Sequence, residues 1–460
     1  MYYSRLIDRY LEEWKERSPR KPLLLRGARQ VGKSSAVRHL GDSFTSFVEI
    51  NFEKNPEFKE LFKTNLDVKR IVRELAAIVG QPITAGQTLL FLDEIQECPE
   101  AIMSLRFFKE DMPELHVIGA GSLLEFALEE LPTFGVGRIH SLFMYPMTFD
   151  EFLEADGHKL LIEARAQATP ESPLPTLIHD KLVSLYRSYL LVGGMPEAVS
   201  QWVGTHDYLQ CQEVQDDLVV SFETDFPKYR KKVNPMLLRL VLRSVALQTG
   251  SKFVYAEVGG GFSTAEIKKA LELLIQAGLC VPVTQTSGNG LPLGAEADYN
   301  VRKMLVMDTG LMLRILNMWV GDSRDEVAAI LTGDPAQLVN KGGIAEMSAG
   351  LELQRYHTPN LRYELFYWQR AARNAQAEID YLIPNGRDIC PVEVKARTRG
   401  GMKSLWIYLR EKRLTTGVRT SLENFASLQY TDPEANGTTR DILICPLYAL
   451  SELPRLLEGK

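Results

Sequence analysis

A glycine-rich segment near the amino end limits the fold of this chain more than any other feature. Residues 27–34 read GARQVGKS and fit the pattern G-x-x-x-x-G-K-[ST], directly after the apolar stretch PLLLR and directly before the helical stretch SSAVRHL. The glycines let consecutive backbone N–H groups curl around phosphate oxygens, and the N-terminus of the following helix adds the positive end of its dipole. The sequence therefore predicts a strand, a phosphate-binding loop and a helix, in that order.

The side chains of this loop predict which phosphate compound it binds. Lys33 is expected to reach the β- and γ-phosphates of a nucleoside triphosphate, and the Ser34 hydroxyl is expected to ligate Mg²⁺. ATP and magnesium are therefore the expected cofactors. The residues expected to bind the nucleotide are Gly27, Ala28, Arg29, Gln30, Val31, Gly32, Lys33, Ser34 and Ser35.

A second apolar stretch supports this prediction. Residues 89–94 read LLFLDE, which is a strand pattern that ends in two carboxylates. Asp93 would complete the Mg²⁺ shell, and Glu94 would orient or deprotonate the attacking water. Both side chains follow the carboxyl end of their strand, where ligands bind in open α/β sheets. The pair therefore predicts hydrolysis of the bound nucleotide.

Two further positions in this region have two interpretations each. Ser122 ends the strand pattern VIGAGS, where it is either a sensor of the γ-phosphate or the N-cap of the helix LLEFALEE. Arg138 follows Gly135, Val136 and Gly137, and it either reaches the nucleotide or is a solvated surface arginine.

Composition excludes several classes of protein. The chain has 460 residues, which at ~100–200 residues per domain indicates more than one domain. With 45% hydrophobic and 24% charged residues, it cannot be collagen-like, mucin-like or wholly disordered. Its five cysteines form no C-x-x-C pair, so neither a disulfide framework nor a zinc ribbon is expected. No apolar run approaches the ~18–20 residues of a membrane span and no secretion signal is visible, so we expect a cytoplasmic protein with no membrane partner.

The order of the patterns predicts the α/β fold class and five parts. Up to about residue 150, short apolar runs alternate with longer helix-like stretches, as in a parallel sheet with crossover helices. Helical patterns follow, and the tail mixes a helix with strands in a separate α/β unit. The predicted parts are an N-terminal amphipathic helix (1–20), a phosphate-binding α/β domain (21–150), a helical lid (151–235), a winged-helix-like module (236–325) and an α/β tail (326–460).

The predicted winged-helix module has a strong helix signal. Ser263 and Glu266 form a capping box, and the helix that they open ends at Gly278, before a segment with the pattern of a hairpin. Lys268 and Lys269 lie on the polar face of that helix. The module either contacts DNA or acts as a rigid joint between domains, because winged helices serve both purposes.

A hairpin in the tail gathers acidic side chains on one face. Residues 378–395 contain an Asn-Gly turn signal between two strand patterns. Because side chains alternate along a strand, the same four residues share a face in either register that this turn allows. They are Glu378, Asp380, Glu393 and Lys395.

The two registers differ in the carboxylate that faces Glu393. If the hairpin is centred between Gly386 and Arg387, Asp380 lies opposite, whereas a two-residue Asn-Gly loop puts Glu378 there. Like charges across a hairpin repel each other, so either arrangement is costly unless a cation lies between the carboxylates.

The chemistry of this face has two interpretations. In the first, Mg²⁺ or Mn²⁺ binds Asp380 and Glu393, and Lys395 stabilises or helps to deprotonate a hydrolytic water. In the second, these are ordinary polar positions, with Lys395 in a surface salt bridge to Glu393. Residues 361–420 contain twelve Lys and Arg against six Asp and Glu, in a chain of net charge −6. A basic rim around an acidic metal centre suits a polyphosphate backbone, so DNA is the expected partner.

Together these motifs resemble a large prokaryotic family in which an AAA-type ATPase is joined to a C-terminal domain of unknown function, of the DUF4143 type, related to PD-(D/E)xK nucleases. The resemblance covers essentially the whole chain. The motifs that carry it are GARQVGKS, FLDEIQ, GAGS, the pair Gly137-Arg138, YPMTFDEF, GGMPEAV, MDTGL, GGIAEM, EIDYLI and VEVKA.

The resemblance implies roles for individual residues. It implies that the residues serving ATP are Lys33, Ser34, Asp93 and Glu94, and that Ser122 acts as a sensor. For a restriction-endonuclease-like site in the tail it implies Glu346, Asp380, Glu393 and Lys395. Glu346 enters through the resemblance alone. Asp380 follows Ile379 rather than a proline, a departure that is common in the nuclease superfamily.

Two hypotheses of function follow. The first is a Mg·ATP-binding ATPase whose nucleotide state controls a nuclease-like tail that interacts with DNA. The second is a nucleotide-gated switch or scaffold that binds a protein or DNA partner and never cleaves it. The sequence leaves open whether the chain forms a homo-oligomer and whether a second copy donates an arginine to the nucleotide.

Overall fold

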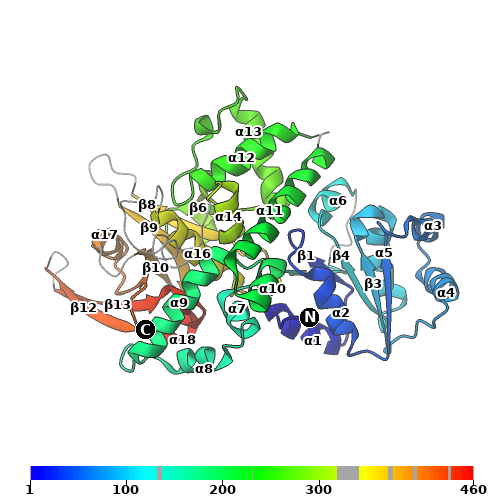
Figure 1. Cartoon of the computed structure of the whole chain (residues 1–460), viewed down its shortest axis with the longest axis horizontal. Helices are drawn as coiled ribbons and strands as arrows, with labels where there is room; N and C mark the ends of the chain where they lie inside the picture. The colour runs from blue at the N-terminus through cyan, green and yellow to red at the C-terminus, as the bar shows by residue number, and fades with distance from the viewer. Residues whose placement is uncertain are drawn as a thin grey trace. The chain divides into compact units, whose positions relative to one another are not determined.

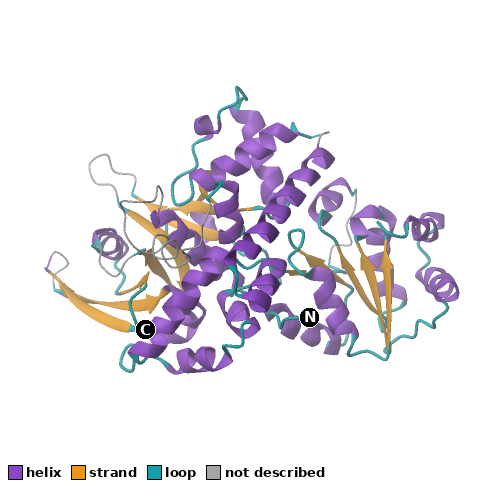
Figure 2. Cartoon of the chain, in the orientation of Figure 1, coloured by secondary structure: helices purple, strands orange, loops and turns teal. Residues whose placement is uncertain are grey.

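The computed structural model describes residues 2–131, 137–229, 232–318, 341–370, 377–396, 401–433 and 437–458. The chain forms two compact units (Figure 1). The first extends to Met147 and includes two short later segments, Gln276–Gly278 and Thr358–Arg362, while the second contains the other described residues. Helices alternate with strands in the first unit, whereas the second begins with a long run of helices (Figure 2).

A five-stranded sheet forms the centre of the first unit. Its strands lie in the order β2-β3-β4-β1-β5, and every pairing between neighbours is parallel. β3 and β4 are buried along their whole length, as expected for parallel strands that are covered on both faces. This confirms the predicted parallel sheet. The strands are β1 (Leu23–Arg26), β2 (Ser46–Asn51), β3 (Thr88–Asp93), β4 (His116–Ala120) and β5 (His140–Phe143).

The helices of the first unit include the expected amphipathic helix at the amino end. α1 buries Ile7, Leu11 and Trp14 along one stripe, and the Trp14 indole N–H donates to the Lys21 carbonyl oxygen at 2.8 Å. This helix is therefore part of the first unit. The helices are α1 (Leu6–Glu16), α2 (Lys33–Gly41), α3 (Lys59–Thr64), α4 (Val68–Val79), α5 (Pro99–Asp111) and α6 (Leu124–Glu130), with short 3-10 helices η1 (Pro56–Phe58) and η2 (Ile95–Glu97).

Helices make up the first part of the second unit. The predicted capping box is present before α13, where the Ser263 N–H donates to Glu266 Oε2 at 2.9 Å and the Glu266 N–H donates to Ser263 Oγ at 3.3 Å. The α-helices are α7 (Phe149–Ala155), α8 (Lys159–Gln167), α9 (Thr176–Val192), α10 (Pro196–Thr205), α11 (Tyr208–Asp225), α12 (Pro235–Leu247), α13 (Thr264–Gln276), α14 (Thr309–Ile315), α16 (Lys341–Arg355), α17 (Lys403–Lys412) and α18 (Leu453–Leu457). The 3-10 helices are η3 (Phe226–Tyr229), η4 (Tyr255–Val258), η5 (Leu293–Glu296) and η7 (Leu447–Glu452).

A mixed eight-stranded sheet completes the second unit, in the order β12-β13-β11-β10-β9-β8-β6-β7. β6 and β7 form the hairpin that we predicted as a wing, and β6 pairs in parallel with β8. The hairpin therefore lies in the same sheet as the strands of the tail. The predicted boundary between residues 325 and 326 falls outside the described residues. The strands are β6 (Cys280–Thr286), β7 (Ala297–Val306), β8 (Leu365–Gln369), β9 (Glu378–Asn385), β10 (Asp388–Val394), β11 (Thr416–Ser421), β12 (Ala426–Asp432) and β13 (Thr438–Pro446).

Two of the motifs that carry the family resemblance meet inside the second unit and have a structural role. Asp308 of the MDTGL motif accepts a hydrogen bond from the Gly194 N–H at 2.6 Å, and it also caps α14 through the Leu311 N–H at 3.1 Å. A Cβ added to Gly193 would lie 2.1 Å from the Asp308 carboxylate. The glycine pair of GGMPEAV therefore allows this close approach.

The remaining sequence-level expectations concern cysteines and membranes. All five cysteines are buried and free. No helix within the described ranges is long and apolar enough to cross a membrane.

Candidate nucleotide site and the carboxylate cluster of the tail

Two glycines shape the loop between β1 and α2. Gly27 has φ +142°, and a Cβ added to it would lie 2.1 Å from the carbonyl oxygen of Met144. Gly32, the N-cap of α2, has φ +98°. Only glycine adopts these backbone conformations without strain. The backbone therefore requires the two glycines of the pattern, and the loop leads into the N-terminus of α2 as predicted.

The Lys33 ammonium lies inside this loop. Its side chain is buried, and Nζ donates to the carbonyl oxygens of Gly27 at 2.9 Å and Ala28 at 2.6 Å. Burial lowers the pKa of Lys33 to about 8, and the carboxylates of Glu94 and Asp93 oppose this shift. The ammonium is thus largely desolvated, so a phosphate oxygen in the loop would form a strong charge-assisted hydrogen bond with it.

The two predicted magnesium ligands lie side by side. Ser34 Oγ donates to Asp93 Oδ1 at 3.0 Å, and Asn51 Nδ2 donates to Asp93 Oδ2 at 2.9 Å. Asn51 faces Asp93 in the register between β2 and β3. Burial raises the pKa of Asp93, and a bound cation would reverse that effect. A hydroxyl and a carboxylate oxygen are donors that Mg²⁺ prefers, so these residues fit the ion.

Glu94 and Ser122 also come together. Ser122 Oγ donates to Glu94 Oε2 at 3.4 Å, and Gln96 Nε2 donates to the same oxygen at 2.6 Å. Glu94 has φ +47°, a left-handed conformation that costs a residue other than glycine on the order of 1 kcal/mol. The N-cap of α6 is Leu123, so the interpretation of Ser122 as that cap is wrong.

Arg138 has a surface position. Its side chain is half exposed and forms an ion pair of 2.5 Å with Glu110 of α5. The structure therefore pairs Arg138 with an acid at the surface rather than with the phosphate loop. Gly135 and Val136, which precede it in the motif, lie outside the described residues.

A buried arginine that sequence analysis missed braces the phosphate loop. Arg5, the N-cap of α1, donates from Nη1 to the Val31 carbonyl oxygen at 2.9 Å and from Nη2 to the Tyr145 carbonyl oxygen at 2.7 Å. Both bonds join segments that are far apart in the sequence, so no spacing pattern indicates them. Arg5 thus ties the N-terminal helix to the middle of the loop.

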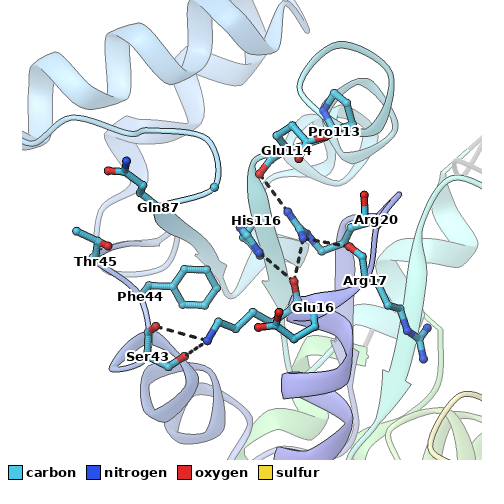
Figure 3. A pocket seen from close by; sticks show the side chains of 13 residues that line it. Glu16, Arg17, Arg20, Ser43, Phe44, Thr45, Gln87, Pro113, Glu114 and His116 are labelled. Atoms are coloured by element: carbon cyan, nitrogen blue, oxygen red, sulfur yellow. Dashed lines mark hydrogen bonds between the residues drawn. The ribbon is translucent and has the colours of Figure 1, made fainter.

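A cavity of about 280 Å³ lies at the amino ends of the strands of the same sheet, opposite the end that carries the phosphate loop (Figure 3). Its lining comes from the end of α1 and from residues just before β2, β3 and β4. Arg20 donates to the carbonyl oxygens of Lys15 at 3.0 Å and Arg17 at 3.3 Å, at the C-terminal end of α1. It also donates to the Glu114 carbonyl oxygen at 3.0 Å. Arg20 therefore caps the helix, and the cavity lies at the amino ends of the strands, away from the phosphate loop.

In the tail, the hairpin β9–β10 adopts the first of the two predicted registers. Val392 faces Tyr381. The hairpin is therefore centred between Gly386 and Arg387. The ladder of paired residues ends there, and the same register continued by one residue would set Asp380 opposite Glu393.

α16 brings Glu346 to this pair. The Tyr381 hydroxyl of β9 donates to the Glu346 carbonyl oxygen at 2.7 Å, and a Cβ added to Gly350 would lie 2.3 Å from the same hydroxyl. The helix packs closely on β9 because Gly350 has no side chain. Burial, followed by the neighbouring Asp380 carboxylate, raises the pKa of Glu346 to about 8.

The cation among these carboxylates is a lysine that sequence analysis missed. Lys303 of β7 is fully buried, and its Nζ donates to Glu346 Oε1 at 2.8 Å and to the Glu378 carboxylate. The same nitrogen lies 3.8 Å from Asp380 Oδ1. Burial alone would lower the pKa of Lys303. The carboxylates of Glu346, Asp380 and Glu378 outweigh this effect and raise the pKa above its usual value. The ammonium therefore stays charged at neutral pH.

The other predicted groups of this site also have protein partners. The Val394 N–H donates to Asp380 Oδ2 at 2.7 Å, and Lys395 forms an ion pair with Glu393. Burial, followed by the Asp380 carboxylate, raises the pKa of Glu393 to about 7. Within the described ranges, no group of three or more His, Cys, Asp or Glu side chains is arranged to hold a metal ion. Asp380 and Glu393, where we expected a divalent metal ion, thus contact protein donors in this structure.

The basic rim of the tail is partly neutralised. Arg370 pairs with Glu411 at 2.7 Å, and Arg419 pairs with Glu423 at 3.3 Å. Three other members of the rim lie outside the described residues, namely Arg373, Arg397 and Arg399. The net positive charge of this segment is thus less available to a polyanion than the count of residues indicates.

Three protein families match parts of the chain. An AAA domain matches residues 19–153, a domain of unknown function (DUF8612) matches residues 183–319, and a domain of unknown function (DUF4143) matches residues 341–431. No curated protein sequence matches the chain.

Three solved structures are similar to this chain at low sequence identity. The Walker-type ATPase of Pyrococcus abyssi is 18% identical with a TM-score of 0.43, over 69% of this chain and 96% of that one. The Orc1 protein of Aeropyrum pernix, solved in complex with DNA, is 15% identical with a TM-score of 0.32, over 71% and 94%. The S. cerevisiae Hsp104–ADP complex is 13% identical with a TM-score of 0.27, over 60% and 38%. From the family matches and the geometry of the phosphate loop, we conclude that the chain carries an AAA domain with a P-loop ATPase fold, followed by a C-terminal domain of the DUF4143 type.

Proposed function

We propose that the first unit binds Mg·ATP and hydrolyses it to ADP and phosphate. The observation that carries this proposal is the contact between the Ser34 hydroxyl and the Asp93 carboxylate, 3.0 Å apart, beside the buried ammonium of Lys33. The match of residues 19–153 to an AAA domain supports the same activity.

Different groups in and beside the loop would bind the phosphates and the Mg²⁺ ion. Backbone N–H groups of the loop and the N-terminus of α2 would hold the phosphate oxygens. Lys33 would exchange its hydrogen bonds to the carbonyl oxygens of Gly27 and Ala28 for bonds to phosphate. Ser34 and Asp93 would hold Mg²⁺, which neutralises phosphate charge when it is bound.

Glu94 would orient the attacking water and accept a proton from it. It follows β3 directly, and hydrogen bonds from Gln96 and Ser122 keep its carboxylate oriented. In hydrolysis, the water oxygen forms a bond to the γ-phosphorus, the bond from phosphorus to the ADP oxygen breaks, and a proton leaves the water for Glu94. Ser122 would act as the sensor of the γ-phosphate, since its hydroxyl lies beside Glu94 and donates to the same Glu94 oxygen as Gln96 does.

Release of phosphate by the purified chain tests this proposal. We expect repeated turnover of ATP in the presence of Mg²⁺ and no turnover when EDTA is in excess, because Ser34 and Asp93 then lack their ion. Restoring Mg²⁺ should restore the rate. A folded chain that releases no phosphate above the blank would contradict the proposed hydrolysis.

The buried position of Lys33 predicts a pH dependence of ATP binding. Its pKa is lowered to about 8 in the empty protein, and phosphate charge would raise it in the complex. Because the ammonium form binds phosphate, affinity should stay constant below about pH 7 and fall by up to about tenfold per pH unit above about pH 8. Calorimetric titration across this range measures the effect.

A matched variant separates the titration of Lys33 from other causes of a pH-dependent affinity. Lys33→Arg keeps its charge at all of these pH values and should show a flat profile, even if its affinity is lower. A wild-type affinity that stays the same on both sides of about pH 8 would show that the charge of Lys33 does not contribute to binding.

For the second unit, we propose the non-cleaving hypothesis, in which the tail binds a partner under control of the nucleotide. The observation that favours it is the Lys303 ammonium among the carboxylates of Glu346, Glu378 and Asp380. A cluster that already holds a lysine cation has less negative charge to draw in a catalytic metal ion than the carboxylates alone would have. DNA or a protein partner remains the expected ligand of this unit.

A further inference from the structure

The acidic cluster of the second unit contains its own cations. Four acids meet here from one helix and two strands, and two lysines lie among them. The acids are Glu346 of α16, Glu378 and Asp380 of β9, and Glu393 of β10; the lysines are Lys303 of β7 and Lys395.

Lys303 lies where three of the carboxylates converge. Its Nζ donates to Glu346 and to Glu378, and it is 3.8 Å from Asp380 Oδ1. The side chain is fully buried, so the ammonium has exchanged water for carboxylate oxygens. An ammonium has three N–H donors, and Lys303 uses them for hydrogen bonds to Glu346 and Glu378, while the Asp380 carboxylate lies within ion-pair distance. A divalent metal ion that used the same oxygens would require the same point in space.

We propose that Lys303 is the resident counter-cation of this cluster in place of a divalent metal ion, and that removal of its charge would open a metal site formed by Glu346, Glu378 and Asp380. The proposal goes beyond ATP hydrolysis and does not depend on it, because all of these residues lie in the second unit.

The other contacts of the cluster agree with this proposal. Asp380 uses its second oxygen to accept the Val394 N–H at 2.7 Å, and Glu393 pairs with Lys395. Among the described residues, Glu393 Oε2 is buried and has no hydrogen-bond partner, and a metal ion would satisfy that atom. The primary test is therefore made on the wild-type chain.

Titration of the full-length wild-type chain with Mn²⁺, without nucleotide, measures whether the cluster takes a metal. Electron paramagnetic resonance counts the free ion directly. We expect no binding at micromolar Mn²⁺ that depends on Asp380, so wild type and Asp380→Asn should give the same curve. Micromolar binding that disappears in Asp380→Asn would overturn the proposal.

The complementary experiment removes the lysine. Lys303→Met should bind Mn²⁺ at least about tenfold more tightly than wild type, because the carboxylates of Glu346, Glu378 and Asp380 then lack this cation. Asp380→Asn in the same background should abolish the gain. Lys395→Met is the matched control, since it removes a lysine from the same cluster but one that pairs with Glu393, and it should give no such gain.

Folding of these variants is checked by thermal melting. If Lys303→Met is unfolded, Lys303→Gln keeps a hydrogen-bond donor without the charge and takes its place. A folded variant at this position that binds Mn²⁺ no better than wild type would overturn the proposal. If neither variant folds, the wild-type titration decides the question alone.

A nicking assay on supercoiled DNA gives a second readout from the same preparations. With Mn²⁺ or Mg²⁺, we expect no nicking by wild type above the level of Asp380→Asn. Nicking that requires both Asp380 and the metal ion would overturn the proposal. Phosphate release from ATP, measured in parallel, shows whether the first unit is active, so failure of one proposal is distinguished from failure of the other.

Discussion

Replacing Glu94 with glutamine should stop ATP hydrolysis while ATP binding persists. Glutamine has nearly the same shape and can still contact Gln96 and Ser122, but its amide does not accept a proton from water. Loss of a general base lowers turnover by ~10²–10⁴-fold. We therefore expect kcat to fall by that factor in Glu94→Gln, while the Kd for Mg·ATP stays within about threefold of wild type.

Single-turnover hydrolysis and a separate binding titration measure the two effects. Ser122→Ala is the control, because it removes only a long hydrogen bond of 3.4 Å to the same carboxylate and should have a much smaller effect on kcat. If Glu94→Gln turned over ATP at the wild-type rate, Glu94 could not be the group that activates water. If it lost ATP binding as well, its role would lie in holding the loop.

Replacing Lys33 with alanine should remove ATP binding. Loss of one partner of a buried, charge-assisted hydrogen bond costs about 2–5 kcal/mol, which corresponds to a Kd weaker by about 30-fold to several thousand-fold. Lys33 is nearly fully buried, so water replaces its ammonium poorly. Phosphate release should fall with binding, and calorimetry with Mg·ATP measures the loss.

A surface lysine of the same unit provides the control for this variant. Lys63 is half exposed and pairs with Glu60, so Lys63→Ala should bind ATP as wild type does. Thermal melting checks that both chains are folded. If Lys33→Ala then bound ATP as tightly as wild type, Lys33 could not be a ligand of the nucleotide.

Local features of the candidate site could be predicted because they depend on backbone conformation. Gly27 and Gly32 are needed where φ is positive, and the loop pattern specifies both positions. The Asn-Gly turn limited the tail hairpin to two registers, and the observed one is centred between Gly386 and Arg387. In each case the physical requirement lies within a few residues of the signal.

Contacts between distant segments could not be predicted from spacing. Asn51 supports Asp93 because the register of β2 and β3 pairs them, although they are 42 residues apart. Arg5 reaches the Val31 carbonyl oxygen across 26 residues. Neither residue belongs to a motif, and a buried polar side chain is recognised only when its partner is known.

Lys303 shows the same limit at the second site. It is 75 residues from Glu378 and belongs to a hairpin that sequence analysis assigned to another module. The parallel pairing of β6 with β8 places that hairpin in the sheet of the tail. The repulsion between the carboxylates predicted a cation near them, either a metal ion or Lys395, and neither interpretation included Lys303.

Calorimetric titration of the folded wild-type chain with Mg·ATP tests the central claim most directly. The account predicts saturable binding of one ATP per chain, weaker binding when Mg²⁺ is left out, and a Kd at least about 30-fold weaker with Lys33→Ala. A folded wild-type chain that gives no more heat than Lys33→Ala would contradict it.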